Sequence, residues 1–220
     1  MLEKIVIFLV VINIGIFVVN KLLSGAPNQN RRAYPTMPLD VSDFGAQNSY
    51  FAIREFENGG ARFLYDLKLD ELDGDVIEMV MLAKSGIYIF EHVPVNGWIY
   101  GMENSENWTK KLQMGSGRKP QEEKFPNPVP IIEKKLEALK KLVDNESVVI
   151  RGLVVFPEVC MLKNIKVFST NVKVVTLDGL LFTTINLNNR IGTNLTQHEI
   201  NELYDTLSQY EEEAELNEQI

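Results

Sequence analysis

A glutamate at the end of an apolar segment is the side chain in this sequence best placed to do chemistry. Glu91 closes the apolar run of residues 86–90 and is followed by His92 and Val93. Side chains alternate between the two faces of a strand, so we expect Glu91 and Val93 to share one face and His92 to lie on the other. A lysine two positions after the glutamate would place a cation beside a metal ligand. Val93 can neither bind a metal nor polarise a water molecule.

Other kinds of catalytic site have little support. The chain has two histidines, His92 and His198, and one cysteine, Cys160, so no cluster has the spacing of a structural zinc site. No Gly-x-Ser-x-Gly turn accompanies a histidine, and a nucleophilic site of the Ser-His-Asp or Cys-His type is not indicated. We expect His92 to be a rim or partly buried residue. Residues 115–119 contain two glycines but lack the spacing of a phosphate-binding loop, and they are interpreted as a mobile loop.

Several short motifs follow one another in an order that resembles a known family. They are Gly45-Ala46-Gln47-Asn48-Ser49, Ile77-Glu78, the segment Gly86 to Glu91, Gly97-Trp98-Ile99-Tyr100-Gly101, Trp108, Asn127-Pro128, and a late apolar strand ending at Phe156. This pattern, over about residues 42–185, resembles the NERD (nuclease-related) domain, a bacterial branch of the restriction-endonuclease-like superfamily. The glutamine that follows Asn-Pro in the family is absent here, with Ile131 near its place.

The resemblance implies a degenerate catalytic site. It implies that Glu91 keeps its acidic role, that Glu78 stands where an aspartate is usual, that Ser49 stands where a helix glutamate is usual, and that Val93 replaces the lysine. A glutamate moves the carboxylate by about one methylene, and Mg²⁺ demands near-ideal octahedral oxygen ligands. Loss of the lysine removes a cation that would stabilise developing charge.

Two functions from different classes are consistent with these residues. The first is a non-catalytic member of the family, a pseudoenzyme that acts as a binding or scaffold module. The alternative is a divalent-metal-dependent nuclease that hydrolyses phosphodiesters, with Glu78 and Glu91 as catalytic residues and Mg²⁺ ligands, and with a basic group supplied from elsewhere in the fold. A glutamate near the end of a strand, taken alone, is most often a solvated surface residue, and only the surrounding pattern favours a role in chemistry.

The N-terminal residues predict a membrane anchor. Residues 5–19 are nearly all apolar, interrupted only by Asn13 and Gly15. About 20 residues span the hydrocarbon core, and residues 2–23 supply that length if Lys4 and Lys21 reach the head groups. A cleaved signal peptide, which would place the remaining domain outside the cell, and a buried helix are the alternatives. Lys21, Arg31 and Arg32 follow the span, which predicts a single-pass protein of the cell membrane with its soluble domain in the cytoplasm. Residues 24–41 read as a linker.

Charge limits the choice of partners. The net charge is −8, and residues 1–40 hold four of the 22 Lys and Arg and two of the 30 Asp and Glu, so the remaining chain carries 18 basic and 28 acidic residues. A net charge of −10 argues against strong nucleic-acid binding and leaves a protein partner as a possibility. Lys134, Lys135, Lys140 and Lys141 alternate with acids and are interpreted as a solvated helix face.

Periodicity predicts one α/β domain over residues 42–190, a mixed sheet flanked by helices, and a C-terminal helix with an acidic tail over residues 191–220. Strands are expected at 62–69, 76–83, 87–93, 98–102, 108–112, 148–156 and 172–176, and helices at 42–57 and 128–143. Residues 177–184 are expected to form a short helix or turn. Thr196 and Glu199 form a capping box that opens the last helix.

Overall fold

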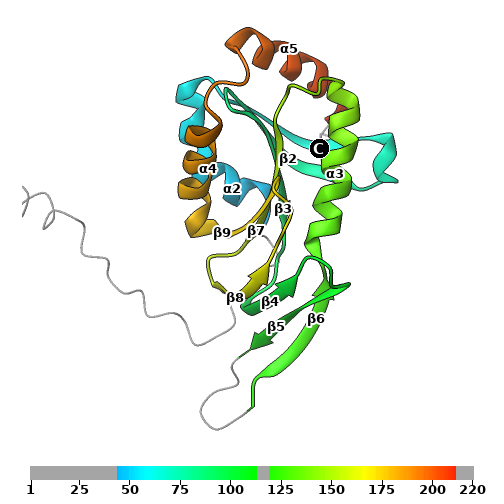
Figure 1. Ribbon diagram of the computed structural model, residues 1–220, viewed down its shortest axis with the longest axis vertical. Coiled ribbons are helices and arrows are strands. Elements are labelled where there is room, and N and C mark those ends of the chain that lie inside the picture. Colours follow the sequence, from blue (N-terminus) through cyan, green and yellow to red (C-terminus); the bar gives the residue numbers. More distant parts are fainter. Residues whose placement is uncertain (1–43, 113–118, 212–220) are drawn as a thin grey trace, which may run out of the picture. The chain divides into compact units, whose positions relative to one another are not determined.

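A five-stranded mixed sheet forms the centre of the folded domain (Figure 1). The computed structural model describes residues 44–112 and 119–211. In order across the sheet the strands are β1 (Arg62–Lys68), β2 (Val76–Ala83), β3 (Gly86–His92), β7 (Ile150–Phe156) and β9 (Val172–Thr176). The first three pair antiparallel, and β3, β7 and β9 pair parallel. The predicted mixed sheet is therefore confirmed.

A second sheet of four strands follows the order β6-β5-β4-β8. Its strands are β4 (Gly97–Met102), β5 (Asn107–Leu112), β6 (Gln121–Pro126) and β8 (Cys160–Lys166). Neither β6 nor β8 was expected from the sequence. The charged segment of β6 becomes a strand because it pairs with β5, where Lys110 and Lys111 form ion pairs with Glu123 and Glu122. Cross-strand pairs of opposite charge offset the low strand propensity of such residues.

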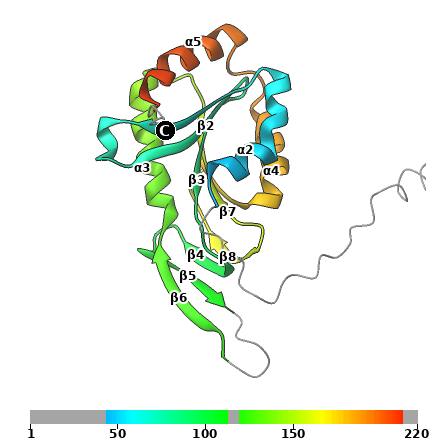
Figure 2. The same ribbon diagram turned by 180° about the vertical axis from the view of Figure 1, so that it is seen from behind.

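Helices cover both faces of the central sheet. One face packs on α3 (Pro128–Val143), and α2 (Ala46–Ile53) and α4 (Leu177–Ile191) lie on the other, as the two opposite views show (Figures 1 and 2). The limits of α3 agree with the prediction, whereas α4 is a full helix where a short helix or turn was expected. A short 3₁₀ helix, η1 (Arg54–Gly59), continues from α2. The predicted capping box opens α5 (Gln197–Leu207).

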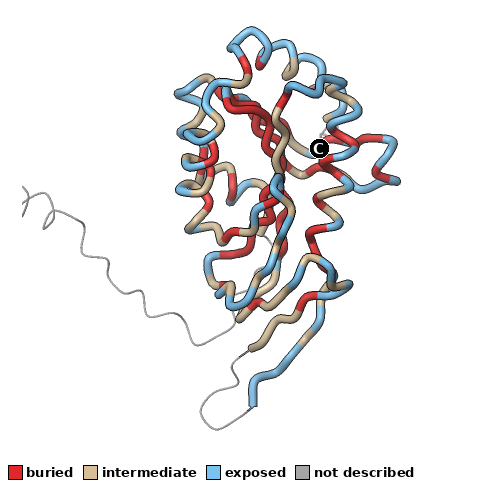
Figure 3. Tube along the Cα trace, in the orientation of Figure 1, coloured by how far each residue is buried: buried red, intermediate tan, exposed pale blue. Residues whose placement is uncertain are grey.

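Alternation along the central strands divides the core into two layers. Ile87 and Ile89 of β3 pack on the side of α3, while Tyr88 and Phe90 pack on the side of α2 and α4. The whole of β3 is buried, which explains its nearly continuous apolar sequence (Figure 3). Side chains at successive positions near the end of this strand therefore enter different environments.

The Asn-Pro motif fixes the start of α3. The side-chain oxygen of Asn127 accepts a hydrogen bond from the backbone N–H of Val129 at 3.0 Å, and its Nδ2 donates to the carbonyls of Glu103 and Ser105, each at 2.7 Å. Asn127 thus caps the helix and ties it to the β4–β5 turn. Gly152 on β7 allows α3 to pack closely, because a Cβ there would lie 2.7 Å from Ile132 Cδ1.

Several predictions fall outside the described residues. These are the membrane anchor at 1–23, the linker at 24–41, most of the loop at 115–119 and the acidic tail after residue 211. Within residues 44–112 and 119–211, no helix is both long and apolar enough to cross a membrane.

The cap at Asn127 can be tested by two substitutions. Asn127→Ala removes the acceptor and both donors of a buried side chain, and we expect it to lower the free energy of unfolding by about 2 kcal/mol. Asn127→Asp keeps the cap acceptor and should cost less than Asn127→Ala. Urea unfolding followed by circular dichroism measures both. An exposed control, Asn107→Ala, should change stability little, and an equal loss in all three variants would contradict this role.

Candidate functional site

Glu91 forms a buried ion pair with a lysine from α3. Lys135 Nζ donates to Glu91 Oε2 at 2.6 Å and lies 3.4 Å from Asp75 Oδ2. The side chains of Lys135 and Glu91 are only 3% and 11% exposed, whereas that of Asp75 is 52% exposed. The acid that the sequence singled out therefore has a cation beside it, supplied by a helix rather than by its own strand.

The position of Lys135 corrects the interpretation of the α3 lysines. Lys134, Lys140 and Lys141 are exposed as expected, but Lys135 is buried. It lies three residues after Ile132 and next to Leu136, both on the apolar stripe of α3 that packs against the central sheet. This spacing places Lys135 at the edge of the buried face. The apolar periodicity that predicts this helix therefore also predicts that Lys135 lies at its buried face.

Burial dominates the electrostatics of Glu91. Desolvation raises the pKa of its carboxyl group above the ordinary value for glutamic acid. Lys135 opposes this rise through its charge and hydrogen bond, while the negative charges of Glu78 and Asp75 reinforce it. The ion pair thus compensates only part of the cost of burying the carboxylate.

Glu78 and Ser49 meet on opposite sides of the His92 ring. The Glu78 carboxylate contacts His92 Nδ1, and Ser49 Oγ lies 2.8 Å from His92 Nε2. Because a carboxylate accepts, Nδ1 carries the proton, and Nε2 of a neutral ring accepts from the serine hydroxyl. Phe44 packs edge-on against the ring at 5.8 Å between centroids. His92 faces away from Glu91 as predicted, but it is fully packed rather than a rim residue.

The Glu78–His92–Ser49 arrangement has the bonding order of a hydrolase relay, with acid, imidazole and hydroxyl in sequence. A nucleophile must reach its substrate, however, and Ser49 has no exposed surface. His92 is almost as deeply buried. We interpret the three residues as a structural network that joins α2 to β2 and β3.

Val93 fills the position where the family resemblance implies a lysine. It is 9% exposed and packs in the core layer on the side of α3. Its backbone N–H donates to the carbonyl of Val155 at 3.0 Å. A lysine introduced here would enter an apolar site on the same face as Lys135.

In this arrangement Glu78 and Glu91, the two acids considered as metal ligands, have different partners. The Glu91 carboxylate bonds to Lys135 on the α3 side of the sheet, whereas that of Glu78 bonds to His92, which packs with α2 on the other side. Across residues 44–112 and 119–211, no three Asp, Glu, His or Cys side chains come together in a group that could hold a metal ion. No step that requires a metal is assigned to these residues.

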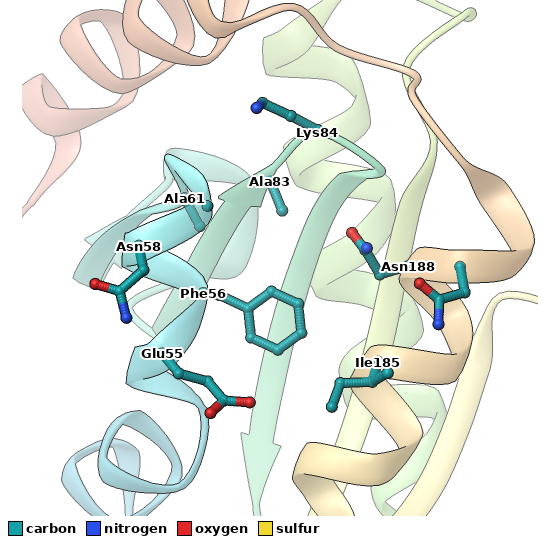
Figure 4. A pocket seen from close by; sticks show the side chains of 10 residues that line it. Glu55, Phe56, Asn58, Ala61, Ala83, Lys84, Ile185 and Asn188 are labelled. Carbon is teal, nitrogen blue, oxygen red and sulfur yellow. The ribbon is translucent and has the colours of Figure 1, made fainter.

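A separate pocket of about 600 Å³ lies at the opposite end of β2 (Figure 4). Phe56 of η1 points into it from one side, and Ile185 and Asn188 of α4 line the other, with Lys84 at the β2–β3 turn. None of the residues matched to the family's catalytic positions lines it. The pocket is therefore distinct from the candidate acids.

Comparison with known proteins identifies the family. The model of the nuclease-related domain, NERD, matches residues 42–157, and the chain therefore belongs to the NERD family. The match ends with β7, so β8, β9, α4 and α5 lie beyond it. An uncharacterized protein of Bacillus anthracis is 27% identical over 135 residues, which are 61% of this chain and 59% of that protein. No solved structure matches the fold significantly.

The buried ion pair makes a prediction about stability and pH. Lys135→Met leaves the Glu91 carboxylate buried with no cation, and we expect it to lower the free energy of unfolding at pH 7 by about 3 kcal/mol. The pKa of Glu91, already raised by burial, rises further in this variant. The folded variant then binds the proton more tightly than the unfolded chain, so its deficit is smallest in acid and grows as pH increases through the raised pKa.

Urea unfolding at several pH values between about 4.5 and 7 measures this effect. The double variant Lys135→Met with Glu91→Gln should recover much of the loss at pH 7 because no uncompensated charge remains. Lys134→Met, which removes an exposed lysine of the same helix, is the control. A Lys135→Met deficit that does not depend on pH would argue against the ion pair.

Proposed function

We propose that this protein is a membrane-anchored NERD domain that has lost catalytic activity and acts as a binding or scaffold module. One observation carries the proposal: each polar residue matched to a catalytic position already has an internal partner. Lys135 pairs with Glu91, and His92 joins Glu78 to Ser49. Val93, at the fourth position, packs in the core. Polar groups that are satisfied within the protein in this way are expected of a site that no longer binds a metal or substrate.

The location of the module is part of the proposal. The apolar segment at residues 1–23 would hold it at the cell membrane as a single-pass protein. The cations after that segment favour a domain in the cytoplasm. Because the chain spans 59% of the Bacillus anthracis relative, functions carried by other parts of such proteins are not inferred for it.

A metal-dependent nuclease is the second candidate, and one feature favours it. A lysine beside the active-site glutamate is the element that the β3 sequence lacks, and Lys135 supplies an ammonium group 2.6 Å from Glu91. Against it, Glu91 bonds to Lys135 on the α3 side of the sheet, whereas Glu78 bonds to His92, which packs with α2. We therefore favour a catalytically inactive binding module over a metal-dependent nuclease.

A cleavage assay decides between the two candidates. We expect the full-length protein with Mg²⁺ or Mn²⁺ to leave single- and double-stranded DNA uncut above background. Val93→Lys alone should not create activity, because Glu78 and Ser49 would keep their bonds to His92. Mg²⁺-dependent nicking by the wild type that disappears in Glu91→Gln, but persists in the exposed control Glu137→Gln, would establish the nuclease instead.

Fractionation tests the membrane anchor. The full chain should sediment with membranes and require detergent for release, whereas a chain lacking residues 1–26 should be soluble. Protease added to intact cells should leave the domain undigested, and protease added to lysed cells should cleave it. Full-length protein in the soluble fraction without detergent would refute the anchor, and digestion from outside would reverse the orientation.

A further inference from the structure

The outward face of the second sheet combines aromatic rings with lysines. The strand register puts Ile99 and Trp108 on the face that packs in the core. Because side chains alternate along a strand, the residues before and after Ile99 and Trp108 point to the outward face. We call this surface the basic–aromatic face, and its members are Trp98 and Tyr100 of β4, Lys111 of β5, Lys124 of β6, and Lys163 and Lys166 of β8. The strands of this sheet are mostly half-buried or exposed (Figure 3).

Cations and rings are in contact across this face. Lys163 Nζ lies 4.8 Å from the ring centroid of Trp98, and Lys111 Nζ lies 5.1 Å from that of Tyr100. These are distances typical of cation–π pairs. Met102 and Met161, which flank the rings, are 44% and 48% exposed. The result is a broad surface of rings with cations beside them.

The charge of this face is opposite to that of the rest of the domain. The register places Lys111, Lys124 and Lys166 on it, and the contact with Trp98 adds Lys163. Among the paired positions of the described strands it holds one acid, Glu122, which pairs with Lys111. Residues 41–220 as a whole carry a net charge of −10. Charges more than about 8–10 Å away are largely screened at physiological salt, so a ligand at this face experiences chiefly the lysines.

We propose that the basic–aromatic face binds single-stranded nucleic acid. The proposal names the ligand class of the binding module inferred above and therefore rests on it. Bases would stack on Trp98 and Tyr100, and the lysines, released from the rings, would contact phosphates. Aromatic platforms with a surrounding positive charge are the general means of binding single strands without sequence preference.

The spacing of the rings selects single strands over duplexes. Trp98 and Tyr100 are two residues apart on one strand, a separation of about 6.6 Å. Bases stacked in a duplex rise by about 3.4 Å. Two neighbouring bases must therefore be splayed apart to occupy both rings, which a single strand allows and a duplex does not.

An anionic membrane surface is the competing ligand, since tryptophan, tyrosine and lysine also gather at lipid head groups. The rings of Trp98 and Tyr100 are half-buried here. Met102 and Met161 are the exposed apolar side chains of this face, and four lysines lie among the rings and methionines. We favour a nucleic acid because both rings that would stack on bases have a lysine in contact.

Fluorescence anisotropy of the full-length protein in detergent, with a labelled 12-nucleotide oligothymidylate as probe, tests the proposal. We expect saturable binding that is stronger than binding of a duplex of the same length. Trp98→Ala or Tyr100→Ala should weaken it at least about fivefold. Phe182→Ala removes an exposed aromatic residue of α4 and should have no effect.

The lysines are tested by the dependence of binding on salt. Lys163→Ala with Lys166→Ala should reduce the slope of log K against log salt concentration by about 1.4, the change for two lost phosphate contacts with a single strand. Lys140→Ala with Lys141→Ala removes the same charge from the exposed surface of α3 and should leave the slope unchanged. Thermal unfolding of each variant checks that the domain remains folded.

Each outcome has a distinct meaning. Absence of oligothymidylate binding, or equal weakening by both lysine pairs, overturns the proposed face and leaves the inactive-module function standing. Binding only to phosphatidylserine vesicles, with loss in the same aromatic variants, also overturns it in favour of a membrane surface. Binding followed by Mg²⁺-dependent cleavage would preserve the face and refute catalytic inactivity.

Discussion

The buried ion pair between Lys135 and Glu91 is the interaction on which the arrangement of the site depends. It joins α3 to the end of β3, where the central sheet turns toward the second sheet. A buried charge pair contributes little net stability compared with apolar residues of similar size, but removal of either partner is costly. The pair therefore restricts the position of α3 on the central sheet. Any position that separates the Lys135 ammonium group from the Glu91 carboxylate would leave two buried charges unpaired. Asn127 at the start of the helix and Gly152 beneath it impose the same placement.

The other matched positions are held by a second polar contact on the opposite face. His92 uses both ring nitrogens, one toward Glu78 and one toward Ser49, and so connects two strands and a helix. A hydroxyl at position 49 is compact enough to be buried with a single hydrogen bond. A glutamate there would have to bury a charge in the same space. A serine at position 49 and a histidine at position 92 are thus physically consistent with each other, since each satisfies a polar atom that the other buries.

Much of this structure follows from local patterns, and the remainder depends on pairing between distant segments. The alternation along β3, the apolar stripe of α3 and the capping box at Thr196 were sufficient to predict these elements and the opposite orientations of Glu91 and His92. The sequence around β6 carries no strand signal, because its charged side chains have low strand propensity and it becomes a strand only by pairing with β5. The burial of Lys135 could have been predicted from the sequence, because its spacing from Ile132 places it at the edge of the apolar stripe of α3. The Ser49–His92 contact was not, because it requires knowing how α2 packs on the sheet.

Charged side chains are arranged differently in the two sheets. In the central sheet, the Glu91 carboxylate is paired with Lys135 in the interior and that of Glu78 contacts His92. In the second sheet, Lys163 and Lys166 of β8 are exposed. The register pairs Lys166 with Met102, and Lys163 contacts the ring of Trp98. A net charge for the whole domain averages over these regions and conceals the difference between them. Screening over about 8–10 Å makes the local arrangement decisive for a ligand, and an acidic protein can for this reason present a surface suited to polyanions.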